Sequence, residues 1–101
     1  YLATELEKAG SKFIVLECVN ENVSNKITNT LSIPTIGIGS SKHCDGQVLV
    51  IDDILNFNSK AKKPKFVKNF VNIEISISKA INNFVRSVKK RKFPLGRHSY
   101  K

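Results

Sequence analysis

Two short apolar runs on either side of an amphipathic stretch constrain the fold of this chain most strongly. Residues 13–16 (Phe-Ile-Val-Leu) are continuously apolar, and residues 35–39 (Thr-Ile-Gly-Ile-Gly) form a second run directly after Pro34. Strands buried on both faces of a parallel sheet have this continuous apolar character, whereas half-exposed strands alternate. The two runs therefore predict parallel strands, over about 13–17 and 34–38.

The stretch between the runs predicts the helix that a parallel pair requires. Val23, Ile27 and Leu31 fall on one helical stripe with polar residues elsewhere, and Asn20 stands where a helix N-cap is expected. A helix over 21–31 would join the strands as a βαβ crossover. The chain is thus predicted to belong to the α/β class.

The remaining pattern extends the same alternation. Residues 47–51 (Gln-Val-Leu-Val-Ile) predict a third buried strand after the turn at Asp45-Gly46. A helix over about 73–90 is predicted from an apolar stripe with spacings of three and four residues. That stripe, expected to face the core, consists of Ile77, Ile81, Phe84 and Val88.

Length and composition narrow the class of protein. A chain of 101 residues allows one domain, and 41% hydrophobic residues are enough for it to fold. No apolar run reaches the length of a membrane-spanning helix and no signal-peptide pattern begins the chain, so a cytoplasmic protein is expected. Cys18 and Cys44 form no CxxC pair, which predicts reduced thiols rather than a disulfide or a zinc site.

The charge distribution raises an alternative from another class of protein. The formal net charge is +9; residues 1–50 carry four lysines and five carboxylates, whereas residues 51–101 carry thirteen basic and three acidic residues. A small nucleic-acid-binding module using residues 60–101 would bind with a steep salt dependence. However, no RNP-like or helix-turn-helix pattern organises the aromatic residues there, so a solvated basic face is the favoured interpretation.

Chemistry is expected at the carboxyl ends of the predicted strands, because ligands of parallel α/β folds bind there. Glu17-Cys18, Gly39-Ser40-Ser41 and Asp52-Asp53 follow the three strands in turn. Glu17 comes directly after four apolar residues, so its carboxylate is expected to be rigidly held and partly buried, as suits a general base. The alternative is a carboxylate that caps the next helix or pairs with a lysine.

The other candidates have weaker signals. The run 37–42 lacks the glycine and lysine spacing of a phosphate-binding loop. Asp52 and Asp53 could bind a divalent metal ion, but adjacent carboxylates point in different directions. His43 and His98 are expected to be solvated, since neither has a second ligand nearby in the sequence.

Five motifs occur in one order along the whole chain, and together they resemble the ketopantoate hydroxymethyltransferase family. In sequence order these are Leu-Glu-Cys-Val (16–19), Leu-Ser-Ile-Pro-Thr-Ile-Gly-Ile-Gly (31–39), Cys-Asp-Gly-Gln-Val-Leu-Val (44–50), Lys-Pro-Lys-Phe-Val-Lys (63–68) and Phe-Pro with His-Ser-Tyr (93–100).

The resemblance implies a (β/α)8 barrel of the phosphoenolpyruvate mutase and isocitrate lyase type, which needs about 250 residues. Residues 1–101 would then be a single partial domain, a C-terminal fragment. Its strands at 13–17, 34–38 and 47–51 would be the last three of the barrel, and the helix at 73–90 would follow them. Such an open piece is expected to aggregate or to stay partly unfolded on its own.

The resemblance also implies an activity. The family transfers a hydroxymethyl group from 5,10-methylenetetrahydrofolate to 3-methyl-2-oxobutanoate, which gives 2-dehydropantoate on the way to pantothenate. A magnesium ion chelates the keto acid as a Lewis acid, and a glutamate removes the C3 proton. The glutamate of Leu-Glu-Cys-Val is that proton acceptor, which implies the same role for Glu17.

Other implications concern what this chain lacks or changes. The family's magnesium ligands belong to earlier strands, so no metal ligand is expected in residues 1–101. The resemblance also implies small-molecule substrates and a homo-oligomer, namely a decamer. Family members usually have Gly-Ala-Gly where this chain has Gly39-Ser40-Ser41, which bears on how closely the loop can approach a ligand. They usually have His-Asp where this chain has Asp52-Asp53.

Overall fold

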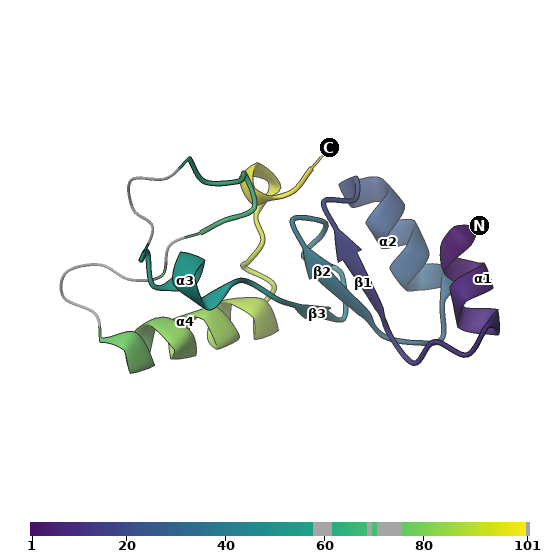
Figure 1. The fold of residues 1–101 in the computed structure, drawn as a ribbon, viewed down its shortest axis with the longest axis horizontal. Coiled ribbons are helices and arrows are strands. Elements are labelled where there is room, and N and C mark those ends of the chain that lie inside the picture. The colour runs from purple at the N-terminus through teal and green to yellow at the C-terminus, as the bar shows by residue number, and fades with distance from the viewer. Residues whose placement is uncertain (58–61, 69, 71–75, 101) are drawn as a thin grey trace.

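A computed structural model describes residues 1–57, 62–68, 70 and 76–100 (Figure 1). In chain order, the helices and strands are α1 (Leu2–Lys8), β1 (Ile14–Glu17), α2 (Glu21–Thr30), β2 (Thr35–Ile38), β3 (Gly46–Gln47), α3 (Ile51–Ile54), α4 (Ile77–Lys89) and the 3-10 helix η1 (Gly96–His98). Figure 1 places the sheet and the first two helices at one end of the molecule, and α3, α4 and η1 at the other.

The three strands form one parallel sheet in the order β1-β2-β3. Ile14 pairs with Thr35 at the start of the β1–β2 ladder, and Glu17 pairs with Ile38 at its end. The prediction of an α/β chain with a parallel sheet is confirmed. Strands that are neighbours in the sheet also follow one another in the sequence, as the strands of successive βα units do.

The predicted third strand at 47–51 is wrong beyond Gln47. The Val48 amide still donates to the Gly37 carbonyl (3.0 Å), but Val50 then caps α3 and Ile51 begins it. A short apolar run has the same pattern in a buried strand and in a helix turn. Asp52 and Asp53 lie in the first turn of α3, where the helix dipole favours negative charge.

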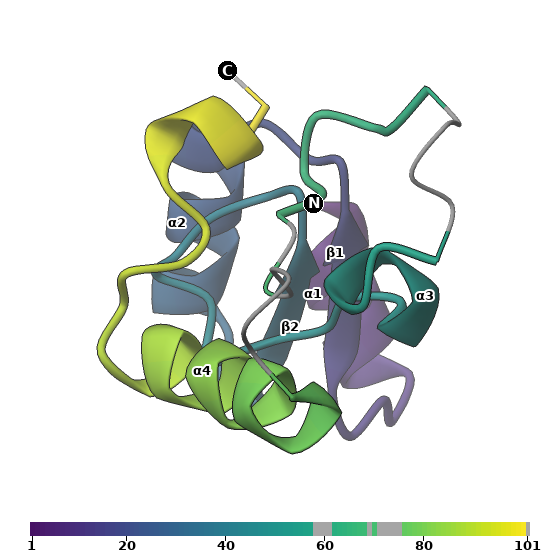
Figure 2. The ribbon, with the colours of Figure 1, turned by 90° about the vertical axis from the view of Figure 1, so that its left-hand side faces the viewer.

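The crossover helix begins as predicted at Asn20. Its Oδ1 accepts hydrogen bonds from the amides of Asn22 (2.9 Å) and Val23 (3.3 Å), which satisfies donors that the first turn leaves free. Ile27 and the residue just after the helix, Leu31, pack against the buried side of β1. Figure 2 shows α2 lying along one side of β1 and β2.

The described residues leave the opposite face of the sheet exposed. Side chains alternate across a strand, so Ile14 and Leu16 are buried while Phe13 and Val15 are 59% and 51% exposed. An open hollow of about 530 Å³ lies over this face. Its lining is largely apolar and includes Phe13, Val15, Pro34, Ile36 and Val48.

Helix α4 begins later than predicted within the described residues. Ser76 is its N-cap and accepts from the Lys79 amide (3.3 Å); of the predicted range 73–90, residues 73–75 lie outside the described residues. The predicted core stripe is only half correct, because Phe84 and Val88 pack against buried residues whereas Ile77 and Ile81 are exposed. Ala80 is fully buried in the first turn, so the buried stripe of α4 runs through Ala80, Phe84 and Val88 instead.

The core of this second region is aromatic. The rings of Phe70, Phe84 and Phe93 meet edge to face, with centroids 5.5 to 6.0 Å apart. Ile54 and Leu55 of the α3 segment complete the buried cluster with Ala80 of α4. In the part of the chain that the structure describes, no helix is both long and apolar enough to span a bilayer.

Candidate functional site

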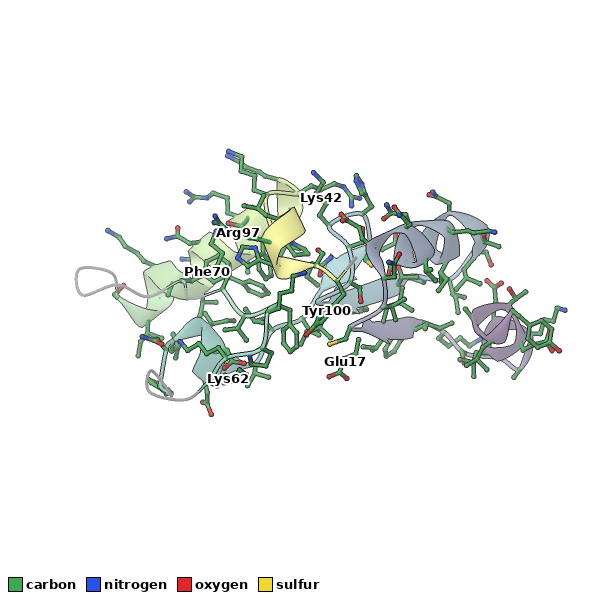
Figure 3. All side chains as sticks on the ribbon, turned by 90° about the horizontal axis from the view of Figure 1, so that it is seen from above. Glu17, Lys42, Lys62, Phe70, Arg97 and Tyr100 are labelled. Atoms are coloured by element: carbon green, nitrogen blue, oxygen red, sulfur yellow. The ribbon has the colours of Figure 1, made fainter. Side chains whose placement is uncertain are left out.

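Glu17 lies at the carboxyl end of β1, on the open face of the sheet. It is the third of the alternating residues Phe13, Val15 and Glu17, so its carboxylate ends an apolar stripe. Figure 3 shows Glu17 projecting from the edge where the C-terminal tail also lies. The expected partial burial is wrong for this chain: Glu17 is exposed, because nothing in the described residues covers this face.

The backbone after Glu17 is held in an unusual conformation. Cys18 has φ of 54°, in the left-handed region that residues with a Cβ seldom adopt. Its amide donates to the Ile38 carbonyl at 2.9 Å, one step beyond the last paired residues of the ladder. The turn therefore stays attached to β2 while the chain leaves the sheet.

Ser40 connects the two sides of this turn. Its buried hydroxyl donates to the Leu16 carbonyl (2.5 Å) and accepts from the Val19 amide (3.2 Å). Ser24 of α2 adds a longer bond from its hydroxyl to the Val19 carbonyl (3.4 Å). The backbone immediately before and after Glu17-Cys18 is thus fixed by contacts with the β2 loop and α2.

The loop after β2 faces the interior rather than an open phosphate site. The Ser41 hydroxyl is fully buried and donates to Oδ1 of Asn25 in α2 (2.5 Å), and the Ser41 carbonyl accepts from Nε2 of Gln47 (2.6 Å). Gly39 has φ of 65°, and a Cβ there would lie 2.8 Å from the Cβ of Phe66. The glycine allows close approach to Phe66, while the Ser41 hydroxyl points toward α2.

The C-terminal tail returns to this same edge. The Tyr100 amide donates to the Gly39 carbonyl (3.2 Å), and the Tyr100 carbonyl accepts from the Glu21 amide (2.8 Å) at the start of α2. A hydrogen bond between the phenol and the Cys18 side chain raises the pKa of Tyr100. Lys65 lies 5.5 Å from the centre of the Tyr100 ring.

The sequence placed Ser40 at this edge only as part of the candidate loop Gly39-Ser40-Ser41, without a role of its own, and Tyr100 had no predicted role there. Ser40 also stood out as a departure from Gly-Ala-Gly, whereas Tyr100 was only the end of the His-Ser-Tyr motif. Both residues meet the Glu17 turn through contacts between segments far apart in the sequence. A departure from a family motif next to a candidate base was the available signal for Ser40.

The other predicted candidates do not join Glu17. Asp52 and Asp53 lie in α3, and among the described residues no three or more His, Cys, Asp or Glu side chains gather in a way that could hold a metal ion. The described part of the chain therefore does not fit a magnesium site by itself. His43 is exposed, and Cys44 is buried, where desolvation raises the pKa of its thiol.

The expectation of a solvated His98 is wrong. Only 7% of the residue is exposed, its Nδ1 accepts from the Leu95 amide (3.2 Å), and its ring lies 5.4 Å from that of Phe93. Desolvation lowers the pKa of His98, and the positive charges of Arg97 and Lys68 lower it further. His98 is a packing residue of η1 in this chain.

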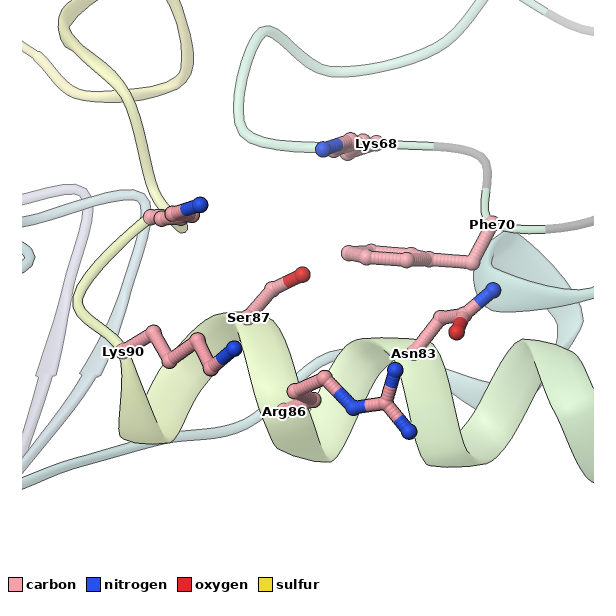
Figure 4. Close-up of a pocket in the computed structure, with 7 residues that line it drawn as sticks. Lys68, Phe70, Asn83, Arg86, Ser87 and Lys90 are labelled. Carbon is pink, nitrogen blue, oxygen red and sulfur yellow. The ribbon is translucent and has the colours of Figure 1, made fainter.

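A basic hollow of about 400 Å³ lies beside α4, away from Glu17 (Figures 3 and 4). Its lining residues are Lys68, Phe70, Asn83, Arg86, Ser87, Lys90 and Lys92. The cations can attract anions, but nucleic-acid bases are usually held by stacking on exposed rings. The Phe70 ring is packed in the aromatic cluster instead, which does not favour the nucleic-acid alternative.

Comparison with known proteins gives a consistent result. A family model described as ketopantoate hydroxymethyltransferase matches residues 2–96. A 3-methyl-2-oxobutanoate hydroxymethyltransferase of Clostridium botulinum (strain Langeland) is 50% identical over 96 residues, which are 95% of this chain and 34% of the relative. Enzymes with the same name from Pelagibacter ubique and Wigglesworthia glossinidia brevipalpis are 50% and 45% identical over 94% and 97% of this chain, and 36% and 37% of their own lengths. The chain spans about a third of these relatives.

Proposed function

The chain belongs to the ketopantoate hydroxymethyltransferase family, and we propose that it forms part of a 3-methyl-2-oxobutanoate hydroxymethyltransferase. The reaction transfers a hydroxymethyl group from 5,10-methylenetetrahydrofolate to 3-methyl-2-oxobutanoate and gives 2-dehydropantoate. The observation that carries the proposal is the place of Glu17. It stands in a Leu-Glu-Cys-Val motif, on the open face of a parallel sheet and at the carboxyl end of its strand.

The proposal includes a (β/α)8 barrel, whose last three strands would be β1, β2 and β3 of this chain. Two features of this chain support it. Neighbouring strands are parallel and follow one another in sequence, and α2 covers one face only. In such a barrel alternate side chains point to the interior, so Val15 and Ile36 would fill the barrel and Glu17 would stand at its active face.

Glu17 is proposed as the base that removes the C3 proton of the keto acid. Its carboxylate is exposed in this chain and stands on the face that would line the barrel interior, so it is free to meet a substrate bound there. The proton leaves C3 and binds a carboxylate oxygen, and the electron pair remains on the substrate as an enolate. The turn at Cys18 fixes the backbone from which this base projects.

Magnesium and the oligomeric assembly rest on the family resemblance alone. The residues described here do not form a metal site, so acidic ligands for magnesium would belong to the rest of the parent protein. The same resemblance supports a homo-oligomer and a cytoplasmic location.

A chimeric enzyme tests the proposal. This chain would replace the matching third of the Clostridium botulinum relative, and turnover of 3-methyl-2-oxobutanoate would be followed with 5,10-methylenetetrahydrofolate. We expect an active chimera in which Glu17→Gln lowers turnover by about 10² to 10⁴, the usual contribution of a positioned base. Glu5→Gln, which changes an exposed carboxylate of α1 that pairs with Lys8, is the matched control.

Two outcomes would contradict the proposal. A folded chimera without activity would argue against the reaction. An active chimera with near-normal turnover after Glu17→Gln would remove the assignment of the base while leaving the family activity in place.

A further inference from the structure

The Ser40 hydroxyl touches the backbone on both sides of the proposed base. It donates to the carbonyl of Leu16, the residue before Glu17, and accepts from the amide of Val19, the residue after Cys18. The side chain of Ser40 is fully buried, so water does not compete for these bonds. One hydroxyl therefore spans the whole Glu17-Cys18 segment.

That segment needs a restraint. Cys18 adopts a left-handed backbone conformation, with φ of 54°, that L residues disfavour. A conformation of this kind persists only where surrounding contacts hold it. The hydrogen bond from the Cys18 amide to the Ile38 carbonyl holds the middle of the turn. The two hydrogen bonds of the Ser40 hydroxyl hold its two ends.

We propose that Ser40 is a positioning residue for Glu17: its hydroxyl holds the turn that aims the catalytic carboxylate. This inference rests on the proposed function. An alanine at this position could form neither bond, because it has no hydroxyl group. Small displacements of a reacting group slow a reaction strongly, because rate depends on near-attack geometry.

The first experiment removes the hydroxyl in the active chimera. Ser40→Ala is expected to fold, since it removes only one buried hydroxyl oxygen and adds no bulk. We expect kcat to fall by about tenfold. The KM for 3-methyl-2-oxobutanoate should change by less than about twofold, because the contacts that bind the substrate equally in the ground state and the transition state stay in place. We also expect the Val19 amide to exchange with solvent at least about tenfold faster, since its acceptor is gone.

A matched control separates this role from the loss of any buried hydroxyl. Ser99 is equally buried, and its hydroxyl donates within the tail, to the Leu95 carbonyl at 3.4 Å. Ser99→Ala should leave kcat and the Val19 exchange rate within about twofold of the unsubstituted chimera. If Ser40→Ala does not fold, Ser40→Cys keeps nearly the same volume with a weak hydrogen-bonding group and takes its place.

A double-mutant cycle with Glu17→Gln decides whether Ser40 acts through Glu17. In the Glu17→Gln background, Ser40→Ala should cause no further loss of turnover, because there is no base left to aim. Multiplicative losses would overturn the proposal and leave Ser40 a structural residue. Unchanged kcat or unchanged Val19 exchange in Ser40→Ala would overturn it too.

The failure of this inference can be told apart from the failure of the proposed function. Near-normal turnover of Glu17→Gln alone would remove the base, and with it the role of Ser40 in catalysis. Val19 exchange would still report whether Ser40 holds the turn. Normal kcat in Ser40→Ala beside a strongly impaired Glu17→Gln would reject only the positioning role.

Discussion

The sheet region and the helical region of this chain have interiors of different chemistry. In residues 1–49 the fully buried side chains are hydroxyl groups, namely those of Ser24, Thr35, Ser40 and Ser41, beside a small apolar cluster of Ile14, Leu16 and Cys44. From residue 50 onward the buried apolar cluster consists of Ile54, Leu55, Phe70, Ala80 and Phe93, and Pro94 and Ser99 are fully buried beside it.

The difference shows how the two regions contribute to function. Hydrogen bonds are directional but each adds only about 0.5–1.5 kcal/mol of net stability, so the hydroxyl-rich interior fixes geometry more than it stabilises. Aromatic burial is less directional and stabilises more. Glu17 ends a strand of the first region, whereas the second region anchors the tail that brings Tyr100 to the same edge.

The largest expected effect tests the aromatic region. In the chimera, Phe93→Ala should lower the free energy of unfolding by about 3–5 kcal/mol, the usual cost of truncating a buried aromatic side chain. Phe93 is 3% exposed and contacts both Phe70 and Phe84. Urea denaturation measures the loss. Phe57→Ala, at a 64% exposed phenylalanine, should cost under about 0.5 kcal/mol, and a similar loss in both variants would refute the importance of the cluster.

A glycine at the sheet edge tests how tightly the two regions meet. Gly39→Ala should cost about 2–4 kcal/mol, since the new Cβ adopts a positive φ and also meets Phe66 at 2.8 Å. Gly10 has a φ of 102° with nothing within 4 Å, so Gly10→Ala measures the backbone cost alone. Urea denaturation of the two glycine variants measures both losses. Equal losses would show that contact with Phe66 contributes nothing.

Thr35 tests the hydroxyl-rich interior. Its Oγ1 lies 2.8 Å from Thr28 Oγ1 and accepts from the Asp45 amide (3.3 Å), so Thr35→Val should cost about 1–3 kcal/mol by removing both hydrogen bonds. Asp45 Oδ2 keeps its hydrogen bond from the Thr35 amide (2.9 Å) in the variant. Thr30→Val, at an exposed position of α2, is the control. A loss for Thr35→Val as large as that for Phe93→Ala would contradict the comparison between the two interiors.

The parts of the fold that were predictable depend on neighbours in the sequence. The Asn20 cap, the crossover helix and the parallel order of the first two strands follow from local periodicity and turn chemistry. The run at 48–51 was mistaken for a strand because an apolar stretch does not distinguish a strand from a helix turn. His98 was mistaken for a solvated residue because its burial depends on Phe93 and on the return of the tail.

The candidate site divides in the same way. The placement of Glu17 at the carboxyl end of a strand followed from the four apolar residues before it. Its exposure did not, since that depends on which elements cover the sheet face. The contacts of Ser40 with Leu16 and Val19 join positions more than twenty residues apart, and no periodicity reports such a pairing.

The smallest expected effect concerns the hydrogen bonds that join α1 to the segment before β2, at the surface of the sheet region. Oε1 of Glu7 accepts from the Ser32 hydroxyl (2.6 Å), the Ser32 amide (2.8 Å) and the Ile33 amide (3.2 Å). The hydrogen bond from the Ser32 side chain, followed by those from the two amides, lowers the pKa of Glu7 below its ordinary value of 4.5. A carboxylate with a lowered pKa in the folded state stabilises that state above its unfolded pKa, and the contribution disappears as the pH falls through the folded pKa.

Glu7→Gln should therefore lower the melting temperature of the chimera slightly at pH 7, and the difference from the unsubstituted chimera should close as the pH falls below about 4.5. Melting curves recorded from pH 7 to pH 3 measure this. Glu5→Gln removes the same charge from the same helix without touching Ser32, so it controls for the charge of α1. A difference that persists undiminished at pH 3 would mean that the Glu7 side chain stabilises α1 through packing, and the contrast between polar and apolar stabilisation would then not extend to the exposed margin of the sheet region.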